Sequence, residues 1–164
     1  RLLGFAKHMD TQHEEIDLAI LLKGVLSFLE KEAGYRNLEV RIDVEDGVQT
    51  IESDRGQLQQ VFVNIVNNAF AAVEDGGRIR IEIAGVGQSR VSVSITDNGV
   101  GIPAEDLKHI FEPFFSTKKG AGTGLGLSIT HGIVQKLGGQ IKVTSKPGEG
   151  TCFTVTLPIR RKHS

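Results

Sequence analysis

The chain is poor in residues that cross-link a fold or bind a metal through thiolates. Its 164 residues include one cysteine, one tyrosine, one methionine and no tryptophan. A lone cysteine cannot form an intrachain disulfide, and no metal-ligand spacing surrounds it. Its alternating context, GTCFTVTL, predicts that Cys152 is a small buried residue of a strand. A reducing compartment fits these absences.

A strong net charge and long apolar runs are also missing. The formal net charge is −1, which gives no general attraction to nucleic acid or to an anionic membrane. No apolar run approaches the ~18 residues of a membrane-spanning helix, and no signal-peptide pattern is present. The chain begins with Arg1 rather than methionine, so we expect a piece of a longer protein. Its 164 residues favour one soluble domain with a single core.

Apolar residues repeat at helical spacing near the N-terminus. The repeat runs from Leu18 to Leu29, and the polar stretch DTQHEEID before it predicts a break. Arg1–Met9 then belongs to a separate short helix. We therefore predict that residues 1–15 are the end of a neighbouring domain's helix and a linker, and that residues 16–164 form the main domain.

Strand-like alternation dominates the rest of the chain. It predicts strands over LEVRIDV, VQTI, RIRIEIAG, RVSVSITD, QIKVTSK and TCFTVTLP. Between them, Asp54 can cap a helix that ends near Val73, and a helical turn follows Pro103. A further helix spans about Leu125 to Leu137. The pattern predicts an α+β fold: a two-layer α/β sandwich whose mixed, mostly antiparallel sheet carries three main helices on one face.

Glycines cluster in the second half of the chain. They are Gly99, Gly101, Gly120, Gly122, Gly124 and Gly126. The run is not a dinucleotide-binding G-x-G-x-x-G, because Leu125 and Leu127 stand where that pattern needs glycine, and the chain has no Gly-Lys dipeptide for a P-loop. The later glycines lie at a predicted helix start, where free N–H groups favour phosphate, and Lys118 and Lys119 could reach an anion. A flexible surface loop is the alternative.

Two amides and a carboxylate occupy positions that packing does not explain. The core stripe of the predicted helix consists of Leu58, Phe62, Ile65 and Ala69. Asn64 and Asn68 share a neighbouring face, where amide oxygens can line a polar cavity and bind Mg²⁺. A solvated face is the alternative, which we expect for Asn67. Asp97 ends a strand, either as an ordinary turn residue or as an acceptor for a ligand's amino group.

Taken together, these segments resemble a known family. QLQQVFVNIVNNAFAA, DNGVGIP, IFEPFFSTK and GTGLGLSI resemble the N, G1, F and G2 boxes of sensor histidine kinases, and GEGTCFTVTLP resembles their closing strand. The resemblance spans roughly Ile16–Pro158 and implies the Bergerat ATP-binding fold. It also implies the ATP-binding catalytic domain of a two-component sensor kinase, which uses ATP and Mg²⁺ and transfers the γ-phosphate to a histidine.

The resemblance further implies roles for individual residues. Asn68 would be the Mg²⁺ ligand, and Asn64 would support the metal and the phosphates as the other catalytic residue. Asp97 would accept the adenine amino group, with Gly99 and Gly101 letting the base approach the backbone, and Thr151 would support the base. A lid over ATP would run from about His109 to Gly124, anchored by Phe111, Phe114 and Phe115. The other residues implied to bind ATP are Ile102, Thr117, Lys118, Gly122, Thr123, Gly124, Leu125, Gly126 and Leu127.

The resemblance implies partners that this chain does not contain. The acceptor histidine would lie on a separate dimerisation domain, because His13-Glu14 is followed by Leu18 where the family's acceptor pattern has proline. The parent kinase would be a homodimer, cytoplasmic or the cytoplasmic portion of a membrane-bound sensor, that passes phosphate to a response regulator. This chain alone would be a monomer.

Two rival interpretations stay open. A gyrase- or MutL-type ATPase carries a glutamate where Asn64 stands, and an amide cannot take a proton from water, so efficient hydrolysis is not expected. An anti-sigma-factor-like serine kinase of the same fold, working by partner switching, is disfavoured by the N-terminal helical segment and the long lid with its phenylalanines.

Overall fold

Five strands form one sheet whose spatial order differs from the order in the chain. The strands are β2 (Glu39–Val44), β4 (Arg78–Val86), β5 (Arg90–Asp97), β6 (Gln140–Lys146) and β7 (Gly150–Pro158). Across the sheet they follow β2-β4-β5-β7-β6, with β2 parallel to β4 and the other neighbours antiparallel. The computed structural model describes residues 13–33, 37–115 and 126–160.

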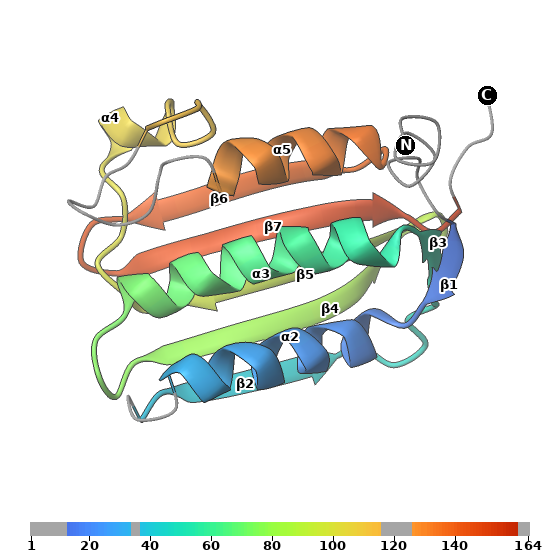
Figure 1. Cartoon of the computed structure of the whole chain (residues 1–164), viewed down its shortest axis with the longest axis horizontal. Helices are drawn as coiled ribbons and strands as arrows, with labels where there is room; N and C mark the ends of the chain where they lie inside the picture. Colours follow the sequence, from blue (N-terminus) through green and yellow to red (C-terminus); the bar gives the residue numbers. More distant parts are fainter. Residues whose placement is uncertain (1–12, 34–36, 116–125, 161–164) are drawn as a thin grey trace, which may run out of the picture.

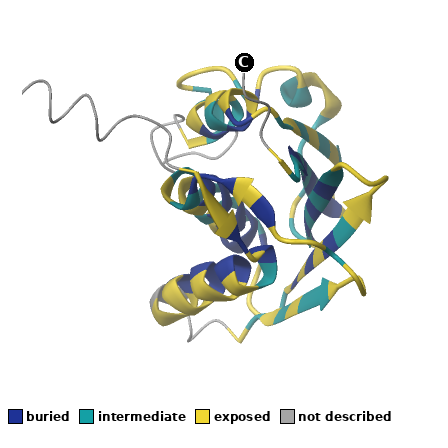
Figure 2. Cartoon of the chain, turned by 90° about the vertical axis from the view of Figure 1, so that its right-hand side faces the viewer, coloured by how far each residue is buried: buried dark blue, intermediate teal, exposed yellow. Residues whose placement is uncertain are grey.

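Three helices cover one face of this sheet (Figure 1). They are α2 (Leu18–Ala33), α3 (Arg55–Ala72) and α5 (Gly126–Lys136), while the short helix α4 (Ala104–Leu107) contacts β6. Figure 2 shows the buried residues gathered between the two layers, with exposed residues on the outer sides. The predicted two-layer sandwich, with a mixed sheet and three main helices on one face, is confirmed.

Alternation of apolar and polar residues gives the sheet one buried face. In β5, Val91, Val93 and Ile95 are buried. The residues that follow each of them, two serines and Thr96, are half-buried on the opposite face, which we call the open face. On the helical side, the predicted stripe of α3 is buried at all four positions: Leu58, Phe62, Ile65 and Ala69. Burial of this apolar surface, at about 25 cal/mol per Å², holds the two layers together.

Local signals set the helix ends. Asp54 Oδ1 accepts a hydrogen bond from the Gln57 backbone N–H at 3.1 Å and caps the first turn of α3, as predicted. The chain turns extended at Val73, and Gly138 adopts a φ of +83° after α5. None of the helices in the described parts of the chain is long and apolar enough to cross a membrane.

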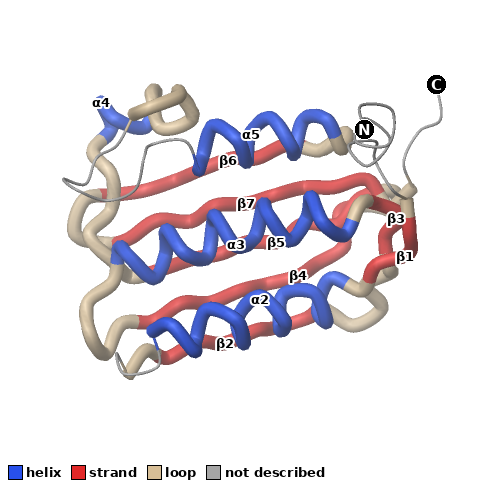
Figure 3. Tube along the Cα trace, in the orientation of Figure 1, coloured by secondary structure: helices blue, strands red, loops and turns tan. Residues whose placement is uncertain are grey.

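The polar stretch before α2 contains a strand that sequence analysis missed. β1 (Glu14–Ile16) pairs antiparallel with β3 (Ile51–Ser53) beside one end of the sandwich (Figure 3). Three residues are too short for an alternating pattern, so the segment was predicted as linker. β3 itself begins at Ile51, three residues later than the predicted VQTI strand. Arg1–Met9 lies outside the described residues.

Cys152 does not occupy the buried position that its sequence context predicted. It is half-buried, and its Sγ lies 3.8 Å from Thr154 Oγ1. The inward positions of β7 are its neighbours, Thr151 and Phe153, which are each 5% exposed. Because strand side chains alternate, the cysteine faces outward, on the open face. Sequence analysis placed Cys152 in the correct strand but on the buried face of the sheet instead of the open face.

Candidate functional site

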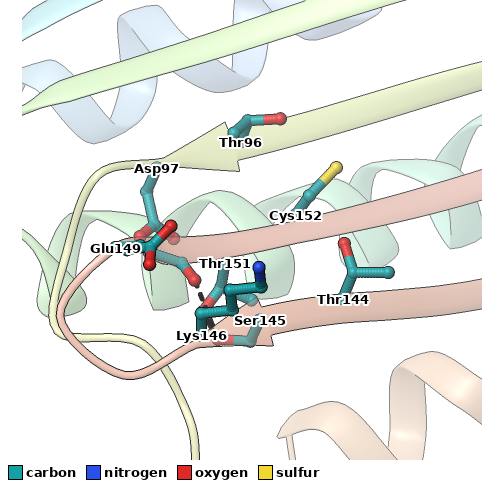
Figure 4. A pocket seen from close by; sticks show the side chains of 9 residues that line it. Thr96, Asp97, Thr144, Ser145, Lys146, Glu149, Thr151 and Cys152 are labelled. Carbon is teal, nitrogen blue, oxygen red and sulfur yellow. Dashed lines mark hydrogen bonds between the residues drawn. The ribbon is translucent and has the colours of Figure 1, made fainter.

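One row of polar side chains crosses three strands on the helical side of the sheet. Register pairs Asp97 of β5 with Thr151 of β7, and Thr151 with Ser145 of β6. Asp97 and Thr151 are each 5% exposed, and Ser145 is half-buried. Directly opposed residues have Cβ atoms about 4.5–5.5 Å apart, so the three side chains form a continuous polar row. Figure 4 shows them at the strand ends.

Ser145 makes three hydrogen-bond contacts within and beside this row. Its Oγ accepts a hydrogen bond from Ile102 N–H at 2.7 Å and donates to the Gly150 carbonyl at 2.8 Å. A third contact, also 2.8 Å, joins it to Thr151 Oγ1. Sequence analysis did not select Ser145. Its position could have been noticed, because it follows Ile141 and Val143 on the inward side of β6, where a polar residue is unusual.

The loop after β5 packs against two other backbones. A Cβ on Gly99 would lie 2.3 Å from the Ala72 carbonyl oxygen, and one on Gly101 would lie 2.1 Å from the Lys146 carbonyl oxygen. Gly101 also has a φ of +77°, which favours glycine. These glycines are therefore required by close packing of the chain on itself. The approach of an adenine base, which the resemblance implied for them, stays a prediction.

Further hydrogen bonds hold this loop in place. Val100 N–H donates to the Ala72 carbonyl at 3.1 Å, at the end of α3, and Gly148 N–H donates to the Val100 carbonyl at 2.8 Å. Gly99 N–H donates to Asp97 Oδ1 at 2.8 Å. The last contact joins residues two apart and is the hydrogen bond of an Asx-turn, which fixes the buried Asp97 carboxylate in place. That this carboxylate accepts the amino group of a ligand stays a prediction.

Asn64 links α3 to the first turn of α5. Its Nδ2 donates to the Gly126 carbonyl at 3.1 Å and to Thr130 Oγ1 at 3.0 Å. Thr130, which is fully buried, donates its own hydrogen to the same Gly126 carbonyl at 2.8 Å. The Gly126 carbonyl and Thr130 Oγ1 therefore both act as acceptors toward the Asn64 amide, so its Nδ2 rather than its Oδ1 faces them. Oδ1 of Asn64 lies 3.3 Å from Gln60 Nε2.

The predicted contrast among the asparagines of α3 is confirmed. Asn64 and Asn68 are half-buried, whereas Asn67 is exposed. No cluster of three or more histidine, cysteine, aspartate or glutamate residues occurs in the described residues, so an Mg²⁺ bound at Asn68 would need ligands from a substrate or water as well. Mg²⁺ is commonly held in this way, by one or two protein oxygens together with substrate phosphates and water. The donor type at Asn68 fits that ion.

The three phenylalanines expected to anchor a lid differ in their packing. The Phe111 ring lies 5.1 Å from the His131 ring of α5, and the Phe115 ring lies 5.7 Å from that of His109. Phe114 is 75% exposed and has a φ of +67°. Phe111 and Phe115 therefore pack on the folded chain, whereas Phe114 does not, and the anchoring of a lid by these rings stays a prediction because residues 116–125 lie outside the described residues.

The remaining predicted residues divide into two groups. Ile102 and Leu127 are half-buried and pack against the core, and Gly126 is the exposed first residue of α5. The others lie outside the described residues, namely Thr117, Lys118, Gly122, Thr123, Gly124 and Leu125. Their predicted contacts with ATP stay predictions.

A hollow of about 280 Å³ lies at the same strand ends, and residues from both faces of the sheet line it. Asp97, Ser145 and Thr151 line it, as do Thr96, Thr144 and Cys152, which share a register row on the open face. Figure 4 shows these side chains in front of the sheet, with the helices behind it. The row of Asp97, Thr151 and Ser145 occupies the alternate positions and faces the helices. We assign the candidate site to the helical side because its polar groups are buried and positioned there.

Comparison with known proteins identifies relatives over nearly the whole chain. A family model described as histidine kinase-, DNA gyrase B-, and HSP90-like ATPase matches residues 53–161. Sporulation kinase E of Bacillus subtilis (strain 168) is 36% identical over 159 residues, covering 97% of this chain and 21% of that kinase. Sensor histidine kinase ZraS of Escherichia coli (strain K12) is 37% identical over 158 residues, covering 96% of this chain and 34% of that kinase. The chain thus spans about a third or less of these relatives.

Solved structures give the same result. The nucleotide-free catalytic domain of histidine kinase ThkA superposes with a TM-score of 0.81 at 32% identity, covering 91% of this chain and 99% of that one. ThkA in complex with the response regulator protein TrrA superposes with a TM-score of 0.79 at 29% identity, covering 96% of this chain and 45% of that one. The fold predicted from the sequence is therefore that of histidine kinase catalytic domains.

The link between α3 and α5 predicts the effect of a charge at Asn64. In Asn64→Asp, a carboxylate oxygen replaces the Nδ2 donor that faces the Gly126 carbonyl and Thr130 Oγ1. An acceptor then faces acceptors, and the hydrogen bonds between α3 and α5 are lost. We expect the free energy of unfolding, measured with urea at neutral pH, to fall by about 1–3 kcal/mol. Asn67→Asp makes the same change at an exposed position of the same helix and should cost much less. Equal losses in both variants would contradict the link.

Proposed function

This chain belongs to the histidine kinase-, DNA gyrase B- and HSP90-like ATPase family, and from that premise we propose that it is the ATP-binding catalytic domain of a sensor histidine kinase. The observation that carries the proposal is a buried, positioned carboxylate, Asp97, at the end of a strand that packs against the asparagine-bearing helix α3. The domain would transfer the γ-phosphate of ATP to a histidine on a separate domain of the same kinase.

Adenine recognition would rest on the row across β5, β7 and β6. The Asp97 carboxylate would accept a hydrogen bond from the amino group of adenine. Gly99 N–H holds Oδ1 of that carboxylate at 2.8 Å, so the group needs little reorganisation when the base arrives. Thr151, next to it in register and equally buried, would support the same edge of the base.

The phosphates would lie along α3, toward the start of α5. Asn68 would hold Mg²⁺ through its amide oxygen, and the bound ion would neutralise charge on the phosphate oxygens. Asn64 would keep the first turn of α5 against α3 through its bonds to Gly126 and Thr130. The positive end of the α5 helix dipole lies at that first turn and favours phosphate.

Transfer to a side chain is better supported than hydrolysis. The Nδ2 of Asn64 is already engaged by two acceptors, and an amide cannot remove a proton from water. A histidine nitrogen needs no such base, because its lone pair can attack the γ-phosphorus directly. In that reaction a P–N bond forms as the bond to the β-phosphate oxygen breaks, and ADP leaves.

The partners follow from this proposal. The phosphoacceptor would be the histidine-bearing dimerisation domain of the parent kinase, itself a homodimer, and a response regulator would then receive the phosphate. The structure of ThkA with the response regulator protein TrrA supports the second step for a relative. The domain would act in the cytoplasm, where ATP and the response regulator are present.

Phosphate transfer to a separate histidine tests the proposed activity. We expect the chain, given γ-labelled ATP and Mg²⁺, to label the histidine-bearing helices of its parent kinase but not itself. Acid-labile label on those helices, lost when their acceptor histidine is replaced, is the expected result. Steady phosphate release without transfer would instead favour the gyrase-type interpretation.

Removing one amide tests the metal role. Asn68→Ala should abolish Mg²⁺-dependent ATP binding in calorimetric titrations, because the protein's oxygen ligand is lost, while the fold stays intact. Asn67→Ala removes the neighbouring exposed amide and should bind as the unmodified domain does. Unchanged Mg²⁺-ATP affinity in Asn68→Ala would refute the assignment.

Neutralising one carboxylate tests the adenine contact. Asp97→Asn should weaken ATP binding by about 1.5–3 kcal/mol, or roughly ten- to a hundredfold, because a hydrogen bond to a charged acceptor is lost. The same change at the exposed Asp46 is the control. The role of Asp97 fails if the unmodified domain binds ATP and GTP equally well.

A further inference from the structure

The hydrogen bonds of Ser145 fix the direction of a neighbouring hydroxyl. A serine hydroxyl has one hydrogen and two lone pairs. The Gly150 carbonyl can only accept, so it takes the serine hydrogen at 2.8 Å, and the Ile102 N–H can only donate, so it uses one lone pair at 2.7 Å. The remaining lone pair faces Thr151 Oγ1 at 2.8 Å (Figure 4). Thr151 must therefore donate its hydrogen to Ser145.

This direction changes what the row offers to a ligand. With its hydrogen committed to Ser145, the Thr151 hydroxyl has only lone pairs left for any other partner. Asp97 lies beside it in register, and an ionised carboxylate also offers only lone pairs. Both residues are 5% exposed, so little water competes for these positions. The Thr151 hydroxyl and the Asp97 carboxylate, which we call the floor of the site, therefore both offer only hydrogen-bond acceptors to a ligand.

We propose that Ser145 is a positioning residue that determines base specificity, by holding Thr151 as an acceptor beside Asp97. This inference rests on the proposed function and deepens it. A floor of two acceptors matches the exocyclic amino group of adenine and repels the carbonyl oxygen that guanine carries at the same ring position. Ser145 does not itself have to touch the base.

Loss of the Ser145 hydroxyl removes the acceptor that holds the hydrogen of the Thr151 hydroxyl. In Ser145→Ala, the Thr151 hydroxyl can rotate and donate to a carbonyl oxygen, so binding of a guanine nucleotide becomes less unfavourable. Ser145→Thr keeps a hydroxyl at the same place in the strand and should preserve the preference for ATP. A residue that only stabilised the fold would lower the affinity for both nucleotides together.

The open face offers a matched control. Ser94 of β5 contacts Thr154 Oγ1 of β7 at 3.1 Å, so Ser94→Ala also removes a serine hydroxyl that bridges two strands. Ser94 lies at an alternate position to Asp97, on the opposite side of the sheet. Its loss should leave the ratio of ATP to GTP affinity unchanged.

The experiment measures dissociation constants for ATP and GTP, both with Mg²⁺, for the full chain and the three variants. We expect the ratio of ATP to GTP affinity to fall about fivefold to tenfold in Ser145→Ala, the scale of one hydrogen bond, and to stay within about twofold in the others. An unchanged ratio in Ser145→Ala, with both affinities lowered equally, would overturn the proposal.

Failure of this inference is distinguishable from failure of the proposed function. If the unmodified chain binds neither nucleotide, the proposed function fails and the specificity role fails with it. If it prefers ATP and Ser145→Ala keeps that preference, only the role of Ser145 is lost. Should Ser145→Ala not fold, Ser145→Cys fills the space with a weakly hydrogen-bonding thiol, and an unchanged ratio in that variant is equally decisive.

Discussion

The register of three antiparallel strands is the constraint on which the candidate site depends. It aligns Asp97, Thr151 and Ser145 across β5, β7 and β6 and turns all three toward the helices. Because strand side chains alternate with a period of two, a slip of one residue would bring Thr96, Cys152 and Thr144 to that side instead. The apolar residues on the same side as the row set this register, since Ile95 and Phe153 would otherwise face solvent. Packing of the apolar core therefore determines which polar side chains face the helices at the candidate site.

A second constraint is the close packing of the backbone around that row. Gly99 and Gly101 let the loop after β5 contact the end of α3 and the β6–β7 turn, at distances that no side chain would permit. Gly150, with a φ of +115°, allows the same closeness to the Asp97 carbonyl. Hydrogen bonds from Gly99 and Ile102 then reach Asp97 and Ser145. Recognition groups are thus held by elements from three separate parts of the chain, and they need little rearrangement on binding.

Much of the architecture could be predicted from the sequence because its pattern is local and repeated. Alternation in RVSVSITD and TCFTVTLP and the stripe from Leu58 to Ala69 identify elements long enough to show a period. Glu14–Ile16 is too short for any period, and its pairing with Ile51–Ser53 depends on residues far along the chain. Cys152 shows a second limit of prediction from sequence. Its strand was identified, but the pattern did not reveal which side chains of that strand face the helices.

Sequence analysis selected several residues of the candidate site but not the contacts that connect them. Asp97, Asn64 and Asn68 stand out because polar residues there serve no packing purpose. Ser145 does not, because its importance comes from contacts with Ile102 and Gly150 that exist only in the folded chain. Likewise, the need for glycine at positions 99 and 101 comes from backbones distant in sequence, which no local pattern reveals.

The central claim is that an adenine nucleotide binds on the helical side of the sheet. The most direct measurement is a titration of the isotope-labelled chain with ATP and Mg²⁺, followed by nuclear magnetic resonance of its side chains. We predict that the side-chain amide signals of Asn64 and Asn68 and the hydroxyl-bearing side chain of Thr151 shift together, while Cys152 and Thr154 on the open face do not. Shifts confined to Cys152 and Lys146, with the asparagine amides unchanged, would contradict the account.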